Sequence, residues 1–134
     1  MWRHPRMKKR LRKPTDAEMN ILRVLWRRGP STVREVWEEI SKAQQTGYTT
    51  VLKTMQIMAE KGLVLRDQRQ KSHIYSPART EDQTQRQAVG YILERVFGGS
   101  TQKLVMQALS ARKANREELA EIRKLLDKME GGAS

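Results

Sequence analysis

The feature that most constrains the fold is a run of three helical apolar stripes followed at once by two short β-prone segments, between residues 15 and 77. The first stripe opens at Thr15, which forms a capping-box pattern with Glu18, and a Gly-Pro pair ends it. For the second stripe, Ser31 and Thr32 are both candidate caps. The apolar positions recur every three or four residues, as in amphipathic helices: Ile21, Leu22, Leu25 and Trp26, then Val33, Val36, Trp37 and Ile40.

The third stripe, residues 48–61, separates into two faces when successive residues are placed about 100° apart around a helix. The apolar arc holds Val51, Leu52, Met55, Met58 and Ala59. The polar arc holds Thr49, Thr50, Lys53, Thr54, Gln56, Glu60 and Lys61. Ile57 breaks this pattern, because it is an apolar residue near the centre of the polar arc.

The β-prone runs at residues 63–65 and 73–75 predict a hairpin, which Pro77 ends. Its polar tip carries Arg69 and Lys71, with no acidic residue between them. These cations suit a DNA backbone or a minor groove, although a plain solvated turn has the same pattern.

Three helices followed by a hairpin is the order of a winged helix-turn-helix, a mainly α fold with a small β-hairpin wing. A major groove admits one α-helix, which needs one face buried in its own domain and another free to reach base edges. Residues 48–61 meet that description, although most amphipathic helices are only solvated on the polar side. The candidate DNA-binding residues are Thr49, Thr50, Lys53, Thr54, Ile57, Arg69 and Lys71.

The charge is high and unevenly placed. The chain has 27 basic and 15 acidic residues, a net charge of +12, and residues 1–14 hold seven of the basic residues and no acidic one. We interpret residues 1–14 as a disordered basic arm that tracks a DNA backbone through counterion release, or else as a solubility tail. Residues 15–79 are the predicted DNA-binding domain.

Residues 80–131 are nearly neutral and predict three further helices, opened by Thr80, Ser100 and Asn115. Three short helices seldom form a stable core alone, so we predict that they bury their apolar stripes in a homodimer. The alternative is packing on the N-terminal domain alone. The predicted dimerisation residues are Val89, Ile92, Val96, Leu119, Ile122, Leu126 and Met129.

Several function classes are disfavoured by what the sequence lacks. The chain has no cysteine, and its two histidines, His4 and His73, lie far apart, so no metal site or cofactor is expected. The acidic residues are expected on solvent faces with no convergent pair, which argues against an enzyme. No segment is apolar and long enough for a membrane span or signal peptide, so we predict a cytoplasmic protein.

Two binding functions compete with a sequence-specific repressor. A basic winged helix also suits a sequence-tolerant nucleoid-type or RNA-binding protein, because basic charge alone gives non-specific binding. A winged helix used only for protein contacts predicts no salt-dependent nucleic-acid binding at all.

Five segments give the chain a resemblance to a known family: Thr15-Asp16-Ala17-Glu18 leading to Val24-Leu25-Trp26, Tyr48-Thr49-Thr50-Val51, Glu60-Lys61-Gly62-Leu63-Val64, His73-Ile74-Tyr75-Ser76-Pro77 and Phe97-Gly98-Gly99-Ser100. Over about residues 15–130 it resembles the penicillinase and methicillin-resistance repressors with their copper-responsive relatives (the BlaI/MecI/CopY family). The resemblance implies a dimeric repressor that binds a double-stranded, palindromic operator. The resemblance also implies that Thr49, Thr50 and Lys53 face the operator bases.

The chain departs from that family at three places. The paired cysteines of the copper-responsive members are absent, which excludes copper sensing through that site. Where members cleaved by a membrane sensor protease have an Asn-Phe bond, this chain has Gln107-Ala108, which leaves the release signal and any upstream sensor or protease unidentified. Ile57 occupies a position that is commonly basic in the family, so one DNA contact differs in kind.

Overall fold

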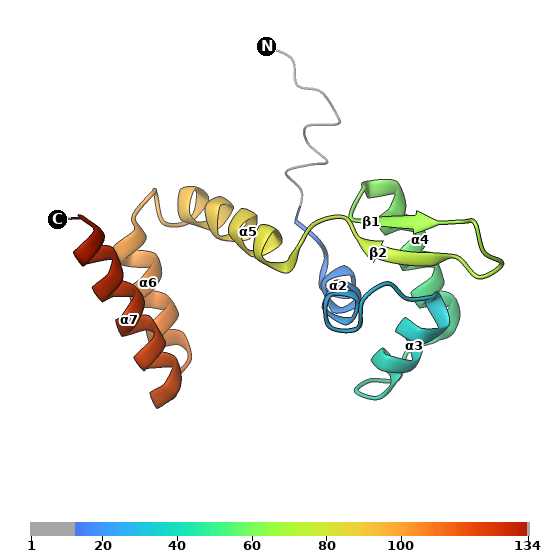
Figure 1. The fold of residues 1–134 in the computed structure, drawn as a ribbon, viewed down its shortest axis with the longest axis horizontal. Helices are drawn as coiled ribbons and strands as arrows, with labels where there is room; N and C mark the ends of the chain where they lie inside the picture. Colours follow the sequence, from blue (N-terminus) through green and yellow to red (C-terminus); the bar gives the residue numbers. More distant parts are fainter. Residues whose placement is uncertain (1–12, 134) are drawn as a thin grey trace, which may run out of the picture. The chain divides into compact units, whose positions relative to one another are not determined.

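The computed structural model describes residues 13–133, and the first twelve residues of the expected basic arm lie outside this range. Six helices and one two-stranded antiparallel sheet follow one another along the described chain (Figure 1). The chain divides into two units between Ala88 and Val89. The domain limits expected at residues 14, 79 and 131 stay predictions.

The first two helices begin at the predicted hydroxyl caps. Helix α2, Asp16–Arg28, starts after Thr15, whose side chain accepts from the Glu18 amide at 3.1 Å while Glu18 accepts from the Thr15 amide at 2.9 Å. Helix α3, Val33–Ser41, has the same reciprocal bonds between Thr32 and Glu35. Of the two candidate caps for α3, the structure therefore uses Thr32.

Ser31 has a different role, which joins the start of α3 to the hairpin. Its amide donates to the Tyr75 carbonyl at 3.0 Å, and the Tyr75 amide donates to the Ser31 carbonyl at 2.8 Å. The hairpin itself pairs β1, Val64–Asp67, with β2, Ile74–Pro77. The wing is thus fixed to the helices through the backbone, which does not depend on side-chain identity.

Helix α4, Tyr48–Lys61, has the predicted limits. Gly62 ends it in the left-handed region, at a φ of +82°, which glycine adopts without the steric penalty of a side chain. The helix packs on α2, α3 and β1, so its apolar side lies against the rest of the first unit.

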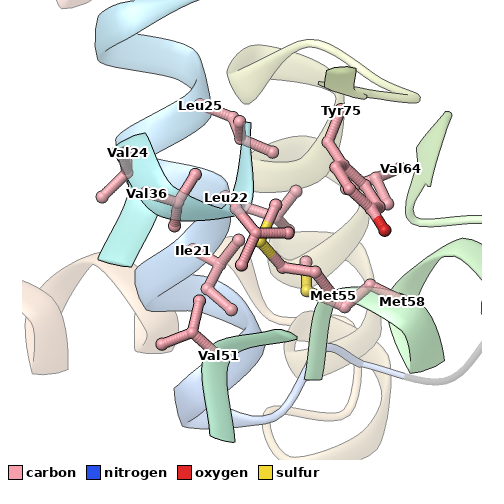
Figure 2. Packing of buried hydrophobic residues seen from close by; sticks show 11 residues of the cluster. Ile21, Leu22, Val24, Leu25, Val36, Val51, Met55, Met58, Val64 and Tyr75 are labelled. Carbon is pink, nitrogen blue, oxygen red and sulfur yellow. The ribbon is translucent and has the colours of Figure 1, made fainter. Parts of the chain in front are cut away.

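Buried side chains from α2, α3, α4 and the wing form one hydrophobic core (Figure 2). Burying one such aliphatic side chain stabilises the fold by about 1.5–3 kcal/mol. Figure 2 shows Val51, Met55 and Met58 of α4 pointing toward α2, with the Tyr75 ring closing the core from the wing. Within the described residues, the buried apolar side chains all belong to the first unit: Ile21, Leu22, Val24, Leu25, Val33, Val36, Val51, Met55, Met58, Val64 and Tyr75.

One acidic residue does not lie on a solvent face as expected. Glu18 is 3% exposed, and its carboxylate accepts from Lys61 Nζ at 2.7 Å. Burial raises the pKa of Glu18, but the bonds from Lys61 and Thr15 outweigh it and hold the pKa below its ordinary value. The pair joins the first turn of α2 to the last turn of α4.

The second part of the chain consists of helices without a core of their own. These are α5, Glu81–Arg95, α6, Thr101–Ala111, and α7, Arg116–Ala133. The predicted caps Thr80, Ser100 and Asn115 each accept from an amide three residues on. No residue from 81 to 132 is buried. None of the helices between residues 13 and 133 is both long and apolar enough to cross a bilayer.

Candidate nucleic-acid interface

The outward side of α4 carries two rows of the predicted DNA-binding residues. Thr49, Lys53 and Ile57 follow one another at intervals of four residues, which places them on one row, and all three are exposed. Ile57 is 41% exposed, so a substantial part of this apolar residue is open to solvent.

Thr50 and Thr54 form the second row, beside α2. They line a shallow hollow together with Ala17 and Asn20 of α2. Thr50 is exposed, but Thr54 is half-buried and its hydroxyl donates to the Thr50 carbonyl at 2.8 Å. Threonine commonly makes this bond inside helices, and it leaves the Thr54 oxygen as an acceptor only.

The N-terminus of α4 is held by aromatic contacts and has no side-chain cap. Trp37 Nε1 donates to the Thr46 carbonyl at 2.7 Å, and the Trp37 ring meets the Tyr48 ring edge to face, with centroids 5.9 Å apart. These contacts fix the turn between α3 and α4. Amides at an uncapped helix start, with the positive end of the helix dipole, favour a phosphate group.

Ion pairs engage most of the cations on α2 and α3, whereas several cations of α4 and the wing have no carboxylate partner within the described chain. The paired groups are Arg27 with Glu39, Arg28 with Glu35 and Glu39, Arg34 with Glu38, and Lys42 with Glu39. Within residues 13–133, Lys53, Arg66 and Lys71 have no carboxylate at ion-pair distance. Both α4 and the hairpin therefore carry exposed positive charge that is open to a polyanion.

The two predicted wing residues differ in their surroundings. Lys71 is exposed at the tip without a carboxylate partner within the described chain. Arg69 is also exposed, but its Nη2 lies 2.8 Å from Asp67 Oδ2 and its Nε lies 3.0 Å from Asp67 Oδ1. A phosphate contact by Arg69 has to share the guanidinium with the Asp67 carboxylate.

The predicted dimerisation residues all lie on α5, on α7 or in the turn after α5, and most are exposed. Val89, Val96, Leu119, Leu126 and Met129 are between 42% and 69% exposed, whereas Ile92 and Ile122 are half-buried. Large apolar side chains that the prediction left out are exposed beside them: Tyr91, Val105, Met106, Leu109 and Leu125.

Sequence reasoning missed three residues that position this interface. Asp67 had a local signal, because an aspartate two residues before an arginine commonly closes a turn of this kind. Trp37 and Thr46 had none, since the bond between the Trp37 indole and the Thr46 carbonyl depends on how the chain turns after α3. No group of three potential metal ligands occurs in the part of the chain that the structure describes.

A family model for penicillinase repressors matches residues 14–128. The chain belongs to the penicillinase repressor family. A transcriptional regulator BlaI from Mycobacterium tuberculosis is 38% identical over 69 residues, which cover 51% of this chain and 50% of the regulator. The chain thus matches about half the length of that relative.

Two penicillinase repressors match over more of their length. The Staphylococcus aureus protein is 22% identical over 83% of this chain and 88% of its own length. The Bacillus licheniformis protein is 22% identical over 89% of this chain and 93% of its own length. Among solved structures, the solution structure of the DNA-binding domain of the repressor BlaI gives a TM-score of 0.47 and 24% identity, over 52% of this chain and 88% of that one.

The family match confirms the expected family, and the observed order of helices and hairpin confirms the expected mainly α fold with a small β-hairpin. The penicillinase repressor family comprises transcriptional regulators rather than enzymes, in agreement with the class predicted from the sequence.

Proposed function

We propose that this chain is a transcriptional repressor that binds a palindromic operator as a homodimer. The observation that carries the proposal is the row Thr49, Lys53 and Ile57 on α4, which is exposed while the opposite side of the same helix is buried in the core. A helix held in this way presents short polar side chains to a major groove without unfolding. Thr50 and Thr54 extend the proposed contact surface on its α2 side.

The distribution of charge supports DNA as the partner. Lys53 on α4 and Lys71 on the wing are exposed without carboxylate partners in the described chain, and the uncapped start of α4 favours phosphate. The wing pairs with Ser31, so α4 and the hairpin belong to one rigid body and contact DNA in a fixed geometry.

The C-terminal helices support the homodimer. Their large apolar side chains are exposed in the described part of one chain, and exposed apolar surface of this kind marks an interaction site. A second copy buries the same stripes and supplies the two-fold symmetry of a palindromic operator. The proposed partners are operator DNA, a second copy of the chain, and an upstream sensor or protease that disrupts the dimer in the cytoplasm.

We expect Lys53→Ala to weaken operator binding by about 1–3 kcal/mol and to relax the preference at one base position, as for loss of a base-edge contact. Titration of selected and random duplexes measures both effects. Lys128→Ala, which removes an exposed lysine from α7, serves as the control and should leave the preference unchanged. Equal weakening of selected and random DNA by Lys53→Ala would contradict base reading by α4.

Competition distinguishes the repressor from a sequence-tolerant nucleoid-type or RNA-binding protein. The full chain should hold its operator in excess random duplex and should prefer B-form DNA to double-stranded RNA, because only the wide major groove of B-form DNA admits α4. Displacement by random duplex at equal concentration would instead support the sequence-tolerant function.

We expect Ile57 to pack on a thymine methyl group, because its exposed apolar side chain lies on the outward row of α4, one turn after Lys53. Replacing thymine by uracil at each operator position in turn should weaken binding at one position, and Ile57→Ala should abolish that difference. Uniform binding across all the uracil-substituted operators would show that Ile57 does not contact a methyl group.

A further inference from the structure

The wing tip contains an ion pair whose geometry is more specific than that of an ordinary surface pair. Asp67 is the last residue of β1, and its Oδ1 accepts from the Arg69 backbone amide at 3.0 Å and from Arg69 Nε at 3.0 Å. Its Oδ2 accepts from Arg69 Nη2 at 2.8 Å. The carboxylate therefore closes the turn and binds the guanidinium along one edge, the arrangement in which arginine and a carboxylate pair most strongly.

The neighbouring cations of the wing are not bound in this way. Lys71 has no carboxylate at ion-pair distance within residues 13–133, and Arg66, on the strand itself, has none either. The tip thus holds two cations of equal charge, of which one is neutralised by Asp67 and the other is free.

We propose that Asp67 restrains sequence-independent DNA binding by the wing, because its carboxylate compensates the charge of Arg69 and occupies the Nε and Nη2 donors of the guanidinium. This inference rests on the proposed DNA-binding function. Non-specific affinity consists almost entirely of phosphate contacts, so one cation withheld from the backbone lowers it directly. An exposed ion pair adds little to stability, and the effect of this pair lies in the charge that the wing presents.

Asp67 and Arg69 both stay charged over the working range of pH. The side-chain bond and then the backbone bond from Arg69 lower the pKa of Asp67 to about 2, and the carboxylate raises the pKa of Arg69. Both groups stay ionised at neutral and mildly acidic pH, so the restraint is a constant property of the wing.

Four variants of the full chain test the proposal by titration onto a random-sequence duplex over a range of salt concentrations. Arg69→Gln and Lys71→Gln each remove one positive charge from the wing tip. Of the two cations, Arg69 is paired with Asp67 and Lys71 is not. Asp67→Asn keeps an oxygen acceptor for the Arg69 amide, so the turn and the unfolding temperature should be retained. The double variant Asp67→Asn with Arg69→Gln shows whether any gain passes through Arg69.

We expect Lys71→Gln to weaken binding about threefold or more and to reduce the magnitude of the salt slope by about 0.9, whereas Arg69→Gln should change affinity less than about twofold. Asp67→Asn should tighten binding about threefold to tenfold and steepen the slope by about 0.9. Adding Arg69→Gln should remove that gain. Glu60→Gln is the control, because it removes an exposed negative charge of α4 without releasing a cation, and its effect should not depend on Arg69.

Two results would overturn the proposal. One is that Arg69→Gln, introduced alone, weakens DNA binding as much as Lys71→Gln does. The other is that Asp67→Asn leaves DNA binding unchanged. In both cases the unmodified chain still binds duplex DNA, and the proposed function stands. If the unmodified chain shows no salt-dependent binding to any duplex, both proposals fall.

Discussion

Truncation after Arg79 is expected to lower operator affinity about 10²-fold to 10⁴-fold while leaving the winged helix folded. The second half-site of a dimer is bound intramolecularly, and a monomeric fragment loses that advantage without losing any base contact. The fragment should fold, because every buried apolar residue of the described chain lies between Ile21 and Tyr75. The Trp26 indole also keeps its bond to the Arg79 carbonyl, at 3.0 Å.

Sedimentation of the fragment and of the full chain, with titration onto one and two half-sites, measures this effect. The full chain should be a dimer both free and on DNA, and the fragment a monomer with equal, weak affinity for either duplex. A full chain that is monomeric at micromolar concentration, or a fragment that binds the operator as tightly as the full chain, would remove α5, α6 and α7 from the mechanism.

Lys61→Met is expected to destabilise the winged helix by about 3 kcal/mol at neutral pH, since it leaves the buried Glu18 carboxylate without its cation. Chemical unfolding followed by tryptophan fluorescence measures the loss. The control is Lys42→Met, whose lysine forms an exposed pair with Glu39 and should cost at most about 1 kcal/mol.

The effect of Lys61→Met should shrink on acidification. In the unmodified chain the Glu18 pKa lies below 4.5, so this carboxylate contributes stability above that pH and loses it as the pH falls through the folded pKa. Without Lys61, burial raises the Glu18 pKa, and protonation relieves the unpaired charge from above pH 4.5 downward. A difference in unfolding free energy between the unmodified chain and Lys61→Met that stays constant from pH 7 to pH 4 would contradict this role of the Lys61–Glu18 pair.

Local signals were enough to predict most of the first unit. The limits of α4 follow from the turn that ends at Gly47 and from Gly62, and the capping box of Thr15 and Glu18 needs only residues within one helical turn. The helical part of the core could be predicted from the apolar stripes, because helical periodicity determines which side chains share a face.

The remaining contacts join segments far apart in the chain. Two adjacent hydroxyl residues, Ser31 and Thr32, were equivalent as caps until the pairing of Ser31 with Tyr75 distinguished them. Glu18 was expected on a solvent face because nothing local indicates that the last turn of α4 brings Lys61 to it. In the candidate site, Thr54 was placed on the polar arc correctly, but the bond that engages its hydroxyl depends on its side-chain rotamer.

We propose that α4 of two copies reads a symmetric DNA sequence. Selection from a pool of random duplexes by the full chain tests this reading most directly. We expect one enriched sequence with two-fold symmetry, its half-sites separated by about 10 base pairs or a multiple of that distance. Lys53→Ala should lose enrichment at one position in each half-site. A pool that remains random after repeated selection, although the protein retains duplex at every round, would contradict sequence reading by this helix.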